Sequence, residues 1–321
     1  MRLENKNNVK YHVIDEGSEG QKIDNFLLKI LKNVPKSHVY KLLRSGQVRV
    51  NKKRIRTDFR LSIGDSVRIP PVSYRERETF VPSSANKSQL TDIEKAIIFE
   101  DNAFIVLNKP QGIAVHGGSG INFGVIELLR QSRPSAKFLE LVHRIDKDTS
   151  GALLVAKKRL ALVNIHKQMR DKSMHKKYEV IVHGQWNKKQ LIVDLNLLKS
   201  SDIDGQKKVS VVDDSNSSVN TKKSRSVFFL KKNFKRFTLL EVKLITGRTH
   251  QIRVHLSHLG FPILGDQKYG DFELNKKLRK VGLGRMFLHA SEVAFTHPIT
   301  MEEVHFIAPT PKEFNKIDAI K

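Results

Sequence analysis

The sequence predicts an α+β fold built on an antiparallel or mixed sheet, with a small basic module in front of it. The length of 321 residues exceeds one typical domain and suits two domains, or a large domain with a small module. Hydrophobic residues make up 39% of the chain, which is enough for a sizeable core. From residue 93 onward, strand-like and helix-like runs follow one another without regular alternation, and this favours α+β over a doubly wound sheet.

The charge of the chain indicates a polyanionic partner. Lys and Arg number 58 against 33 Asp and Glu, which gives a formal net charge of +25 at pH 7. Nucleic acid is the first candidate for that partner and an anionic membrane is the second. No apolar run reaches 18 residues, the N-terminus lacks the apolar stretch of a secretory signal, and there is no cysteine. We therefore expect a cytoplasmic protein without disulfides, thiolate metal sites or cysteine nucleophiles.

The composition divides the chain into four segments. Residues 1–19 are expected to be an N-terminal extension and residues 20–70 a small basic module. Residues 71–92 contain prolines and a serine run and are expected to be a linker, which leaves residues 93–321 for the large domain.

The basic module is expected to hold two short helices and a β-hairpin. The first helix is predicted by apolar residues at helical spacing, and the second begins near Pro35. Alternation at Val48–Val50, a turn at Asn51–Lys52 and a second strand near Ile55 predict the hairpin. The apolar positions of the first helix are Ile23, Phe26, Leu27, Ile30 and Leu31.

The module has few acids to balance its bases, with thirteen Lys or Arg against three Asp or Glu in residues 20–70. Its order of elements, followed by Gly64–Val67, resembles the αL RNA-binding module of the ribosomal-protein-S-four type. A solvated charged face is the alternative, and membrane insertion is disfavoured because the first helix lacks a Trp/Phe-rich face. The resemblance implies that RNA is contacted by Lys36, Lys41, Arg44, Lys52, Lys53 and Arg54.

Apolar runs and turn residues predict the elements of the large domain in order. They are a hairpin at 97–99 and 104–107, a helix at 124–131, a strand at 152–156, a helix at 160–170, and strands at 178–182 and 239–244. Residues 200–219 hold eleven Ser, Asp or Asn and are expected to form an exposed loop or weak hairpin of unknown role.

The stretch His143-Arg-Ile-Asp-Lys-Asp-Thr-Ser-Gly151 is the most informative motif. It places two carboxylates among bases in a loop that ends in glycine. Neighbouring cations favour the ionised form of a carboxylate, which a nucleophile or base requires. The alternative is an Asx-type turn capped by Asp148 and Thr149 with surface charges around it.

This motif resembles the signature loop of the RluA-type family of RNA pseudouridine synthases. Further segments match the family in order from about residue 95 to residue 310. They are Asn108–Gly112, Lys176–Tyr178, Thr246–Leu256, Gly260–Gly270, His289-Ala290 and Phe295–Pro298. The resemblance implies the pseudouridine synthase fold, with a central mixed sheet and flanking helices.

The resemblance also implies an activity, the conversion of uridine to pseudouridine. This reaction breaks the N1–C1′ bond, turns the base and joins C5 to C1′, so it requires no redox, phosphate-transfer or metal chemistry. We expect no cofactor. A carboxylate is needed beside the ribose, and the family match assigns that role to Asp146. Attack on the sugar and removal of the 2′ proton both remain open.

The other catalytic assignments also come from the resemblance. Tyr178 matches the tyrosine that stacks on the target uracil. Arg253 matches the arginine that pairs with the catalytic carboxylate, and Arg248 is the competing candidate. An odd spacing on one strand would send these two arginines to opposite faces, so both should not reach Asp146 without a bend, and Arg253 is favoured.

Arg144 matches the arginine that fills the gap left by a flipped nucleotide, and its two-residue step to Asp146 would project both side chains to one side. Lys109 is assigned to the substrate cleft, where Lys109 and Pro110 are expected to shape the floor. His143 is expected to be structural.

Several alternatives bear on function. A metal site at His250, His255 and His258 is disfavoured because the spacing matches no common zinc pattern. The segment at 116–120 and the basic module favour large-subunit ribosomal RNA as the partner, by resemblance. A synthase acting on transfer RNA and a non-catalytic RNA-binding or ribosome-assembly protein are the alternatives. A monomer is expected.

Overall fold

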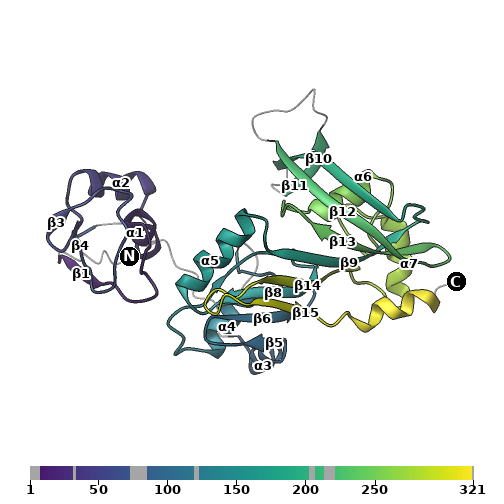
Figure 1. The fold of residues 1–321 in the computed structure, drawn as a ribbon, viewed down its shortest axis with the longest axis horizontal. Helices are drawn as coiled ribbons and strands as arrows, with labels where there is room; N and C mark the ends of the chain where they lie inside the picture. The colour runs from purple at the N-terminus through teal and green to yellow at the C-terminus, as the bar shows by residue number, and fades with distance from the viewer. Residues whose placement is uncertain are drawn as a thin grey trace, which may run out of the picture. The chain divides into compact units, whose positions relative to one another are not determined.

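The computed structural model of the chain describes residues 8–31, 34–72, 85–118, 123–201, 207–212 and 221–319. The chain divides into two units, Met1–Ser83 and Ser84–Lys321, which are described one at a time (Figure 1). No described helix is long and apolar enough to cross a membrane.

The first unit contains a four-stranded antiparallel sheet in the order β1-β4-β2-β3 and two helices. Its elements are β1 (Lys10–Val13), α1 (Ile23–Ile30), α2 (Lys36–Arg44), β2 (Arg49–Val50), β3 (Lys53–Arg54) and β4 (Ser66–Ile69). The apolar face of α1 is buried, as its spacing predicted, and packs in one core with Val39 and Leu43 of α2. The predicted helices and hairpin are confirmed.

The β2–β3 hairpin is closed by Asn51 and Lys52. Both residues have positive φ, 48° and 67°, which is the geometry of the two-residue turns that match strand twist. The Asn51 side chain fixes the turn, since its amide donates to Asp65 at 2.7 Å and its oxygen accepts the Ser66 N–H at 2.9 Å. The turn therefore holds Lys52 and Lys53 at a defined exposed tip.

One boundary differs from the expected extension at 1–19. Lys10–Val13 is strand β1, and it pairs with β4 along its whole length. Tyr11 and Val13 are exposed in this strand, so its apolar pattern does not point to a core. The strand is held by backbone hydrogen bonds, which leave no signal in the hydrophobic pattern.

The second unit is built on a sheet in the order β11-β10-β12-β13-β9-β14-β8-β6-β5, with β15 on β14 and β7 on β8. Of the strand pairs in the described part of the chain, β14 with β8 is parallel and the others are antiparallel, so the sheet is mixed, as predicted. The elements are α3 (Lys87–Lys95), β5 (Ile97–Glu100), β6 (Phe104–Lys109), α4 (Val125–Ser132), β7 (Glu140–Leu141), β8 (Ser150–Ala156), α5 (Arg159–Arg170), β9 (His175–His183), β10 (Gln190–Ser201), β11 (Lys207–Val212), β12 (Lys222–Asn233), β13 (Phe237–Leu244), α6 (Gln251–His258), α7 (Phe272–Lys280), β14 (Leu288–Thr296), β15 (Glu303–Ile307) and a 3₁₀ helix (Lys312–Ala319).

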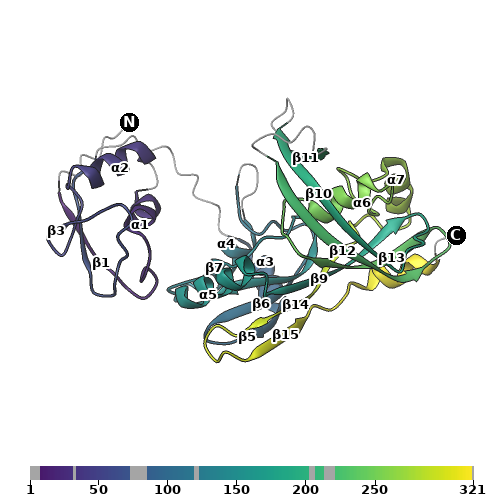
Figure 2. The same cartoon turned by 45° about the horizontal axis from the view of Figure 1, so that its top comes forward.

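The helices lie in two groups on this sheet. Figures 1 and 2 show α3, α4 and α5 beside the β5–β6–β8 half, and α6 and α7 beside the half made by β10 to β13. Strand β8 is buried at every position from Ser150 to Ala156, which makes it the centre of the first half. The signature loop 143–149 leads into this strand, so a rigid core holds the loop from behind.

Part of the expected linker at 71–92 is helical instead. Helix α3 begins with a capping box in which the Asn86 side chain accepts the Gln89 N–H and the Gln89 side chain accepts the Asn86 N–H. Glu94 of α3 accepts hydrogen bonds from Ser132 and Arg133 at the end of α4. These contacts attach α3 to the second unit, and its low apolar content explains why the serine-rich composition suggested a linker.

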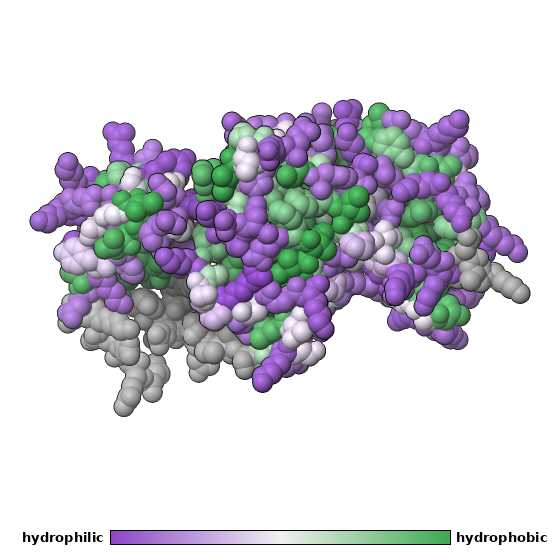
Figure 3. Space-filling model, turned by 60° about the horizontal axis from the view of Figure 1, so that its bottom comes forward, coloured by the Kyte–Doolittle hydropathy of each residue, from purple (hydrophilic) through white to green (hydrophobic). Residues whose placement is uncertain are grey.

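On the face drawn in Figure 3, hydrophilic side chains surround smaller apolar areas.

Residues 200–219 were expected to form an exposed loop or weak hairpin. They include the end of β10 and strand β11, which pair antiparallel. Residues 202–206 and 213–219 lie outside the described part.

Candidate active site

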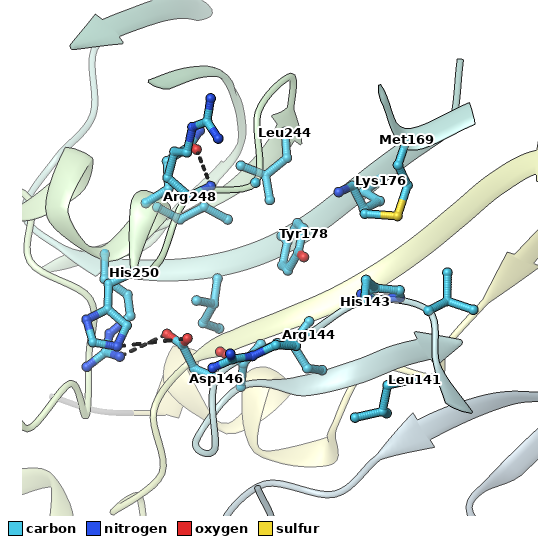
Figure 4. Close-up of a pocket in the computed structure, with 18 of the residues that line it drawn as sticks. Leu141, His143, Arg144, Asp146, Met169, Lys176, Tyr178, Leu244, Arg248 and His250 are labelled. Atoms are coloured by element: carbon cyan, nitrogen blue, oxygen red, sulfur yellow. Dashed lines mark hydrogen bonds and ion pairs between the residues drawn. The ribbon is translucent and has the colours of Figure 1, made fainter. Parts of the chain in front are cut away.

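The signature loop lines a cavity of about 470 Å³ in the second unit. Loop residues Arg144, Ile145 and Asp146 form one wall, and Tyr178 of β9 and α6 contribute others (Figure 4). Loop, strand and helix come from distant parts of the sequence, so the fold assembles this cavity.

Backbone hydrogen bonds fix the second half of the loop. The Thr149 N–H donates to the Asp146 carbonyl at 3.2 Å, and the Gly112 N–H donates to the Lys147 carbonyl at 2.9 Å. Gly151 has φ +109°, and a Cβ there would lie 2.2 Å from the Ala290 carbonyl oxygen. The glycine at the end of the motif is therefore required by the close approach of β14 to β8.

Asp146 contacts Arg253, one of the two candidate arginines. Arg253 Nη1 donates to Asp146 Oδ2 at 2.9 Å, and the arginine is buried while the carboxylate is about one quarter exposed. Burial opposes the charge of Arg253, but the adjoining Asp266 and Asp146 raise its pKa above the ordinary value.

The prediction that Arg248 and Arg253 lie on one strand is wrong. The stretch 246–256 is not one strand: Gln251–His258 is helix α6, and the residues before it are turns. Arg248 is exposed at the pocket edge, where its Nε donates to the Lys223 carbonyl at 3.1 Å. The helix directs Arg253 inward, and the preceding turn leaves Arg248 at the rim.

Asp266 is a site residue that sequence reasoning did not single out. Its side chain is fully buried and accepts Arg253 Nε at 2.7 Å and Nη2 at 2.8 Å. It also accepts the N–H groups of Lys268 and Tyr269. The segment Gly265-Asp266 was visible only as part of the family resemblance, since no periodicity marks it.

Tyr178 lies in the pocket wall with its ring close to the Asp146 loop (Figure 4). Its side chain is only 6% exposed. Burial, and then the negative charge of Asp146, raise the pKa of Tyr178, so its hydroxyl stays protonated. An apolar face next to a carboxylate is a suitable surface for a flat base.

Arg144 and His143 belong to the same loop but have different surroundings. Arg144 is exposed and lines the cavity beside Asp146, on one side as the two-residue step predicted (Figure 4). His143 Nε2 accepts the Leu154 N–H of β8 at 3.2 Å, and burial lowers its pKa. A neutral ring that accepts a backbone hydrogen bond is a structural histidine, as expected.

Lys109 does not line the pocket, in contrast to its assignment to the substrate cleft. It is fully buried, and its ammonium donates to the carbonyls of Pro110, Ile113 and Lys147 at 2.7, 2.8 and 3.0 Å. Burial lowers its pKa to about 7. The side chain thus ties the 110–113 turn to the signature loop and is out of reach of a substrate.

Lys176, two residues before Tyr178, also lines the pocket, and burial lowers its pKa. It was named in the sequence only as part of a motif. In the first unit, the six bases assigned to RNA are all exposed: Lys36, Lys41, Arg44, Lys52, Lys53 and Arg54. Of these, Arg54 also donates to the Arg44 carbonyl and so links the hairpin to α2.

Two of the three histidines considered for a metal contact hydroxyl groups instead. His250 contacts Tyr269, and His255 contacts Ser224. No group of three or more metal-ligating side chains is found in the described residues.

Comparison with known proteins agrees with this geometry. The family model described as RNA pseudouridylate synthase matches residues 103–258, and that of the S4 domain matches residues 21–67. Ribosomal large subunit pseudouridine synthase C of Pasteurella multocida is 48% identical over 309 residues, which cover 96% of this chain and 93% of the relative. The protein of that name from Haemophilus influenzae is 47% identical, with 96% and 94% covered.

Solved structures give the same fold. Human RNA pseudouridylate synthase domain containing 4 has a TM-score of 0.58 at 26% identity and covers 71% of this chain and 93% of its own. Human RNA pseudouridylate synthase domain containing 1 has a TM-score of 0.56 at 25% identity and covers 70% of this chain and 85% of its own. The family resemblance and the fold expected from the motifs are confirmed, and the chain belongs to the RNA pseudouridylate synthase family with an S4 domain in its N-terminal unit.

Proposed function

We propose that this protein is an isomerase that converts specific uridines to pseudouridine in large-subunit ribosomal RNA, with Asp146 as the acting carboxylate. The observation that carries the proposal is the Asp146–Arg253 ion pair at 2.9 Å beside Tyr178 in one cavity. The substrate is supported by relatives named ribosomal large subunit pseudouridine synthase C that match nearly the whole chain. We expect it to act as a cytoplasmic monomer.

The cavity suits a single extruded nucleoside. A base must leave its stack before its glycosidic bond can be reached, at a cost of about a few kcal/mol. In the proposed complex, the exposed guanidinium of Arg144 occupies the gap in the RNA, and the ring of Tyr178 stacks on the uracil. The ribose then faces the Asp146 carboxylate.

Each residue has a separate task in the proposed reaction. The N1–C1′ bond breaks, the uracil turns, C5 bonds to C1′, the proton leaves C5 and N1 gains one. Asp146 either bonds to C1′ or removes the 2′ proton, and both routes require a carboxylate held toward the sugar. Arg253 holds that carboxylate through Oδ2.

The S4 domain is proposed to supply affinity away from the reacting uridine. Its exposed bases lie on α2 and the β2–β3 hairpin, where they can neutralise phosphates. Lys36, Lys41, Arg44, Lys52 and Lys53 are the proposed contacts, and Arg54 is assigned mainly to joining the hairpin to α2.

Tritium release from C5-labelled uridine in ribosomal RNA tests the proposal. Wild-type protein is expected to release tritium, and Asp146→Asn is expected to release none while still binding RNA. The matched control is Asp171→Asn, the same change at an exposed residue after α5, which should keep wild-type activity. Equal release by wild type and Asp146→Asn would contradict the catalytic role, and absence of release by both would indicate a non-catalytic RNA-binding protein.

The identity of the RNA is tested in cells. Pseudouridines are mapped in large-subunit ribosomal RNA and in transfer RNA, with and without this protein. Loss of sites from ribosomal RNA alone supports the proposed substrate, and loss from transfer RNA contradicts it.

A further inference from the structure

His250 and Tyr269 stand next to the Asp146–Arg253 pair. Asp146 Oδ2 accepts Arg253 Nη1 at 2.9 Å, while Oδ1 lies 3.9 Å from His250 Nε2. The two carboxylate oxygens therefore face two different partners, and dashed lines in Figure 4 run from the labelled Asp146 toward His250 and its neighbour. The role of His250 depends on which of its two ring nitrogens carries the proton.

The backbone fixes where the His250 ring points. His250 is the residue before α6, in the left-handed conformation with φ 53° and ψ 19°. Its ring meets the Tyr269 ring edge-on, with centroids 5.5 Å apart and planes at 67°. Nδ1 lies 2.9 Å from the Tyr269 hydroxyl oxygen, so that Nε2 is the nitrogen left to face Asp146.

The bonds to Tyr269 select one tautomer of His250. The Tyr269 oxygen already accepts the Val209 N–H at 3.0 Å. Its own proton can then be donated to His250 Nδ1, and burial raises the pKa of Tyr269, which keeps that proton in place. A neutral imidazole that accepts at Nδ1 carries its proton on Nε2. Burial also lowers the pKa of His250 and favours the neutral ring.

Strand β11 anchors this arrangement. Val209 is buried with Leu197 of β10 and Val254 of α6. Within the part of the chain that the structure describes, β11 is the last strand at its end of the sheet, so N–H groups on its outer edge meet no neighbouring strand there. The Tyr269 hydroxyl receives one of them, and this gives the β10–β11 pair a link to the pocket.

We propose that His250 is a positioning residue for Asp146: Tyr269, held by Val209, fixes the tautomer in which His250 Nε2–H faces Oδ1. Arg253 holds one carboxylate oxygen by a hydrogen bond of 2.9 Å, and the His250 N–H, 3.9 Å from the other oxygen, orients the carboxylate through its dipole. The inference deepens the proposed function and rests on it, since it concerns the carboxylate assigned to the reaction.

The tautomer is measured first, without reference to activity. Long-range proton–nitrogen NMR spectra of the full chain report which imidazole nitrogen carries the proton, and the His250 signals are identified by their loss in His250→Gln. We expect protonated Nε2 and unprotonated Nδ1 in wild type, and a mixed or reversed tautomer in Tyr269→Phe. Protonated Nδ1 in wild type, or an unchanged tautomer in Tyr269→Phe, would overturn the proposal.

The second test measures the rate of tritium release after His250 is replaced by Gln or by Asn. Gln can place an N–H donor near the position of Nε2, and Asn, which tolerates the left-handed backbone, places its amide near Nδ1. We expect kcat for C5 tritium release to fall about tenfold in Tyr269→Phe and His250→Asn with KM nearly unchanged, and less than about threefold in His250→Gln.

Two further variants separate a positioning role of His250 from a general loss of activity. Adding Tyr269→Phe to His250→Gln should cause little further loss, because the donor no longer depends on the tyrosine. The control Tyr11→Phe removes a hydroxyl from an exposed tyrosine of the first unit and should leave kcat unchanged. Equal loss in His250→Asn and His250→Gln would overturn the positioning role. If neither wild type nor any variant releases tritium, the proposed function is contradicted. The NMR spectra still show which tautomer His250 adopts.

Discussion

Asp266 binds Arg253 through two parallel hydrogen bonds, of 2.7 Å to Nε and 2.8 Å to Nη2, which leaves Nη1 to contact Asp146. One guanidinium is thus shared between a fully buried carboxylate and a partly exposed one. The planar fork of arginine fits this arrangement because its donors point in fixed directions. Asp266 therefore determines the orientation in which Arg253 meets Asp146.

This relationship predicts that Arg253→Lys is not a conservative change. An ammonium cannot bond Asp266 at two points and reach Asp146 as well, so the carboxylate loses its fixed position. We expect kcat for tritium release to fall about 100-fold, because misplacement by about 1 Å has that effect, with RNA affinity nearly unchanged. Arg279→Lys on the exposed side of α7 is the matched control. A loss below about threefold in Arg253→Lys would contradict the argument.

The sequence predicted the Asp146 loop and the elements around it because their signals are local. Helices α4 and α5 have apolar residues at helical spacing, and β8 is a continuous apolar run. The signature loop is a contiguous motif. The resemblance then named Tyr178 and Arg253 as its partners, and both line the cavity with it.

The parts that were not predicted depend on contacts between distant segments. Helix α6 is buried on nearly all sides, so its sequence lacks the polar stripe that marks a surface helix, and it was taken for a strand. The role of Asp266 depends on an arginine thirteen residues earlier. Lys109 looked like a cleft residue because burial of a lysine is rare, and only the fold supplies its three carbonyl partners.

Lys109 gives a prediction about stability. In Lys109→Met, the carbonyls of Pro110, Ile113 and Lys147 lose their shared donor. The Lys147 carbonyl keeps the Gly112 N–H, so the carbonyls of Pro110 and Ile113 are the two that lose this partner without that compensation. Each buried carbonyl left without a partner costs about 1–3 kcal/mol, partly relieved by water, so we expect the free energy of unfolding to fall by about 2–5 kcal/mol in urea titrations.

The control for this change is Lys95→Met at an exposed position of α3, where the effect should stay within about 0.5 kcal/mol. Equal urea midpoints for Lys109→Met and wild type would show that the buried ammonium contributes nothing to stability.

The hairpin of the S4 domain predicts the salt dependence of RNA binding. Lys52 and Lys53 are exposed at its tip. Each phosphate contact contributes about 0.7–0.9 to the slope of log K against log salt, so replacing both by Ala should flatten the slope by about 1.5 and weaken binding. Turnover of a saturating short substrate should stay nearly intact, because the reacting residues are untouched.

Lys276→Ala with Lys277→Ala on α7 removes the same charge from another exposed surface and is the matched control. If both double variants flatten the slope equally, the effect reflects net charge and not a contact made by the hairpin.

Buried histidines predict that the fold loses stability in mild acid. His255 is fully buried in α6 and lies 2.8 Å from the Ser224 hydroxyl. Burial, and then the charge of His258, lower its pKa from 6.5 to about 4. The unfolded chain therefore binds this proton first as the pH falls, and the free energy of unfolding decreases between about pH 6.5 and pH 4.

The slope from one such group is about 1.4 kcal/mol per pH unit, so between neutral pH and about pH 5 wild type should lose about 2 kcal/mol more than His255→Gln. Urea titrations of both proteins at the two pH values measure this difference, and the other titrating groups, His143 included, cancel because both proteins share them. Gln retains a donor for Ser224 but binds no proton in this range. Parallel losses in the two proteins would show that folding does not lower the pKa of His255, and would contradict the proposed effect of its burial in α6.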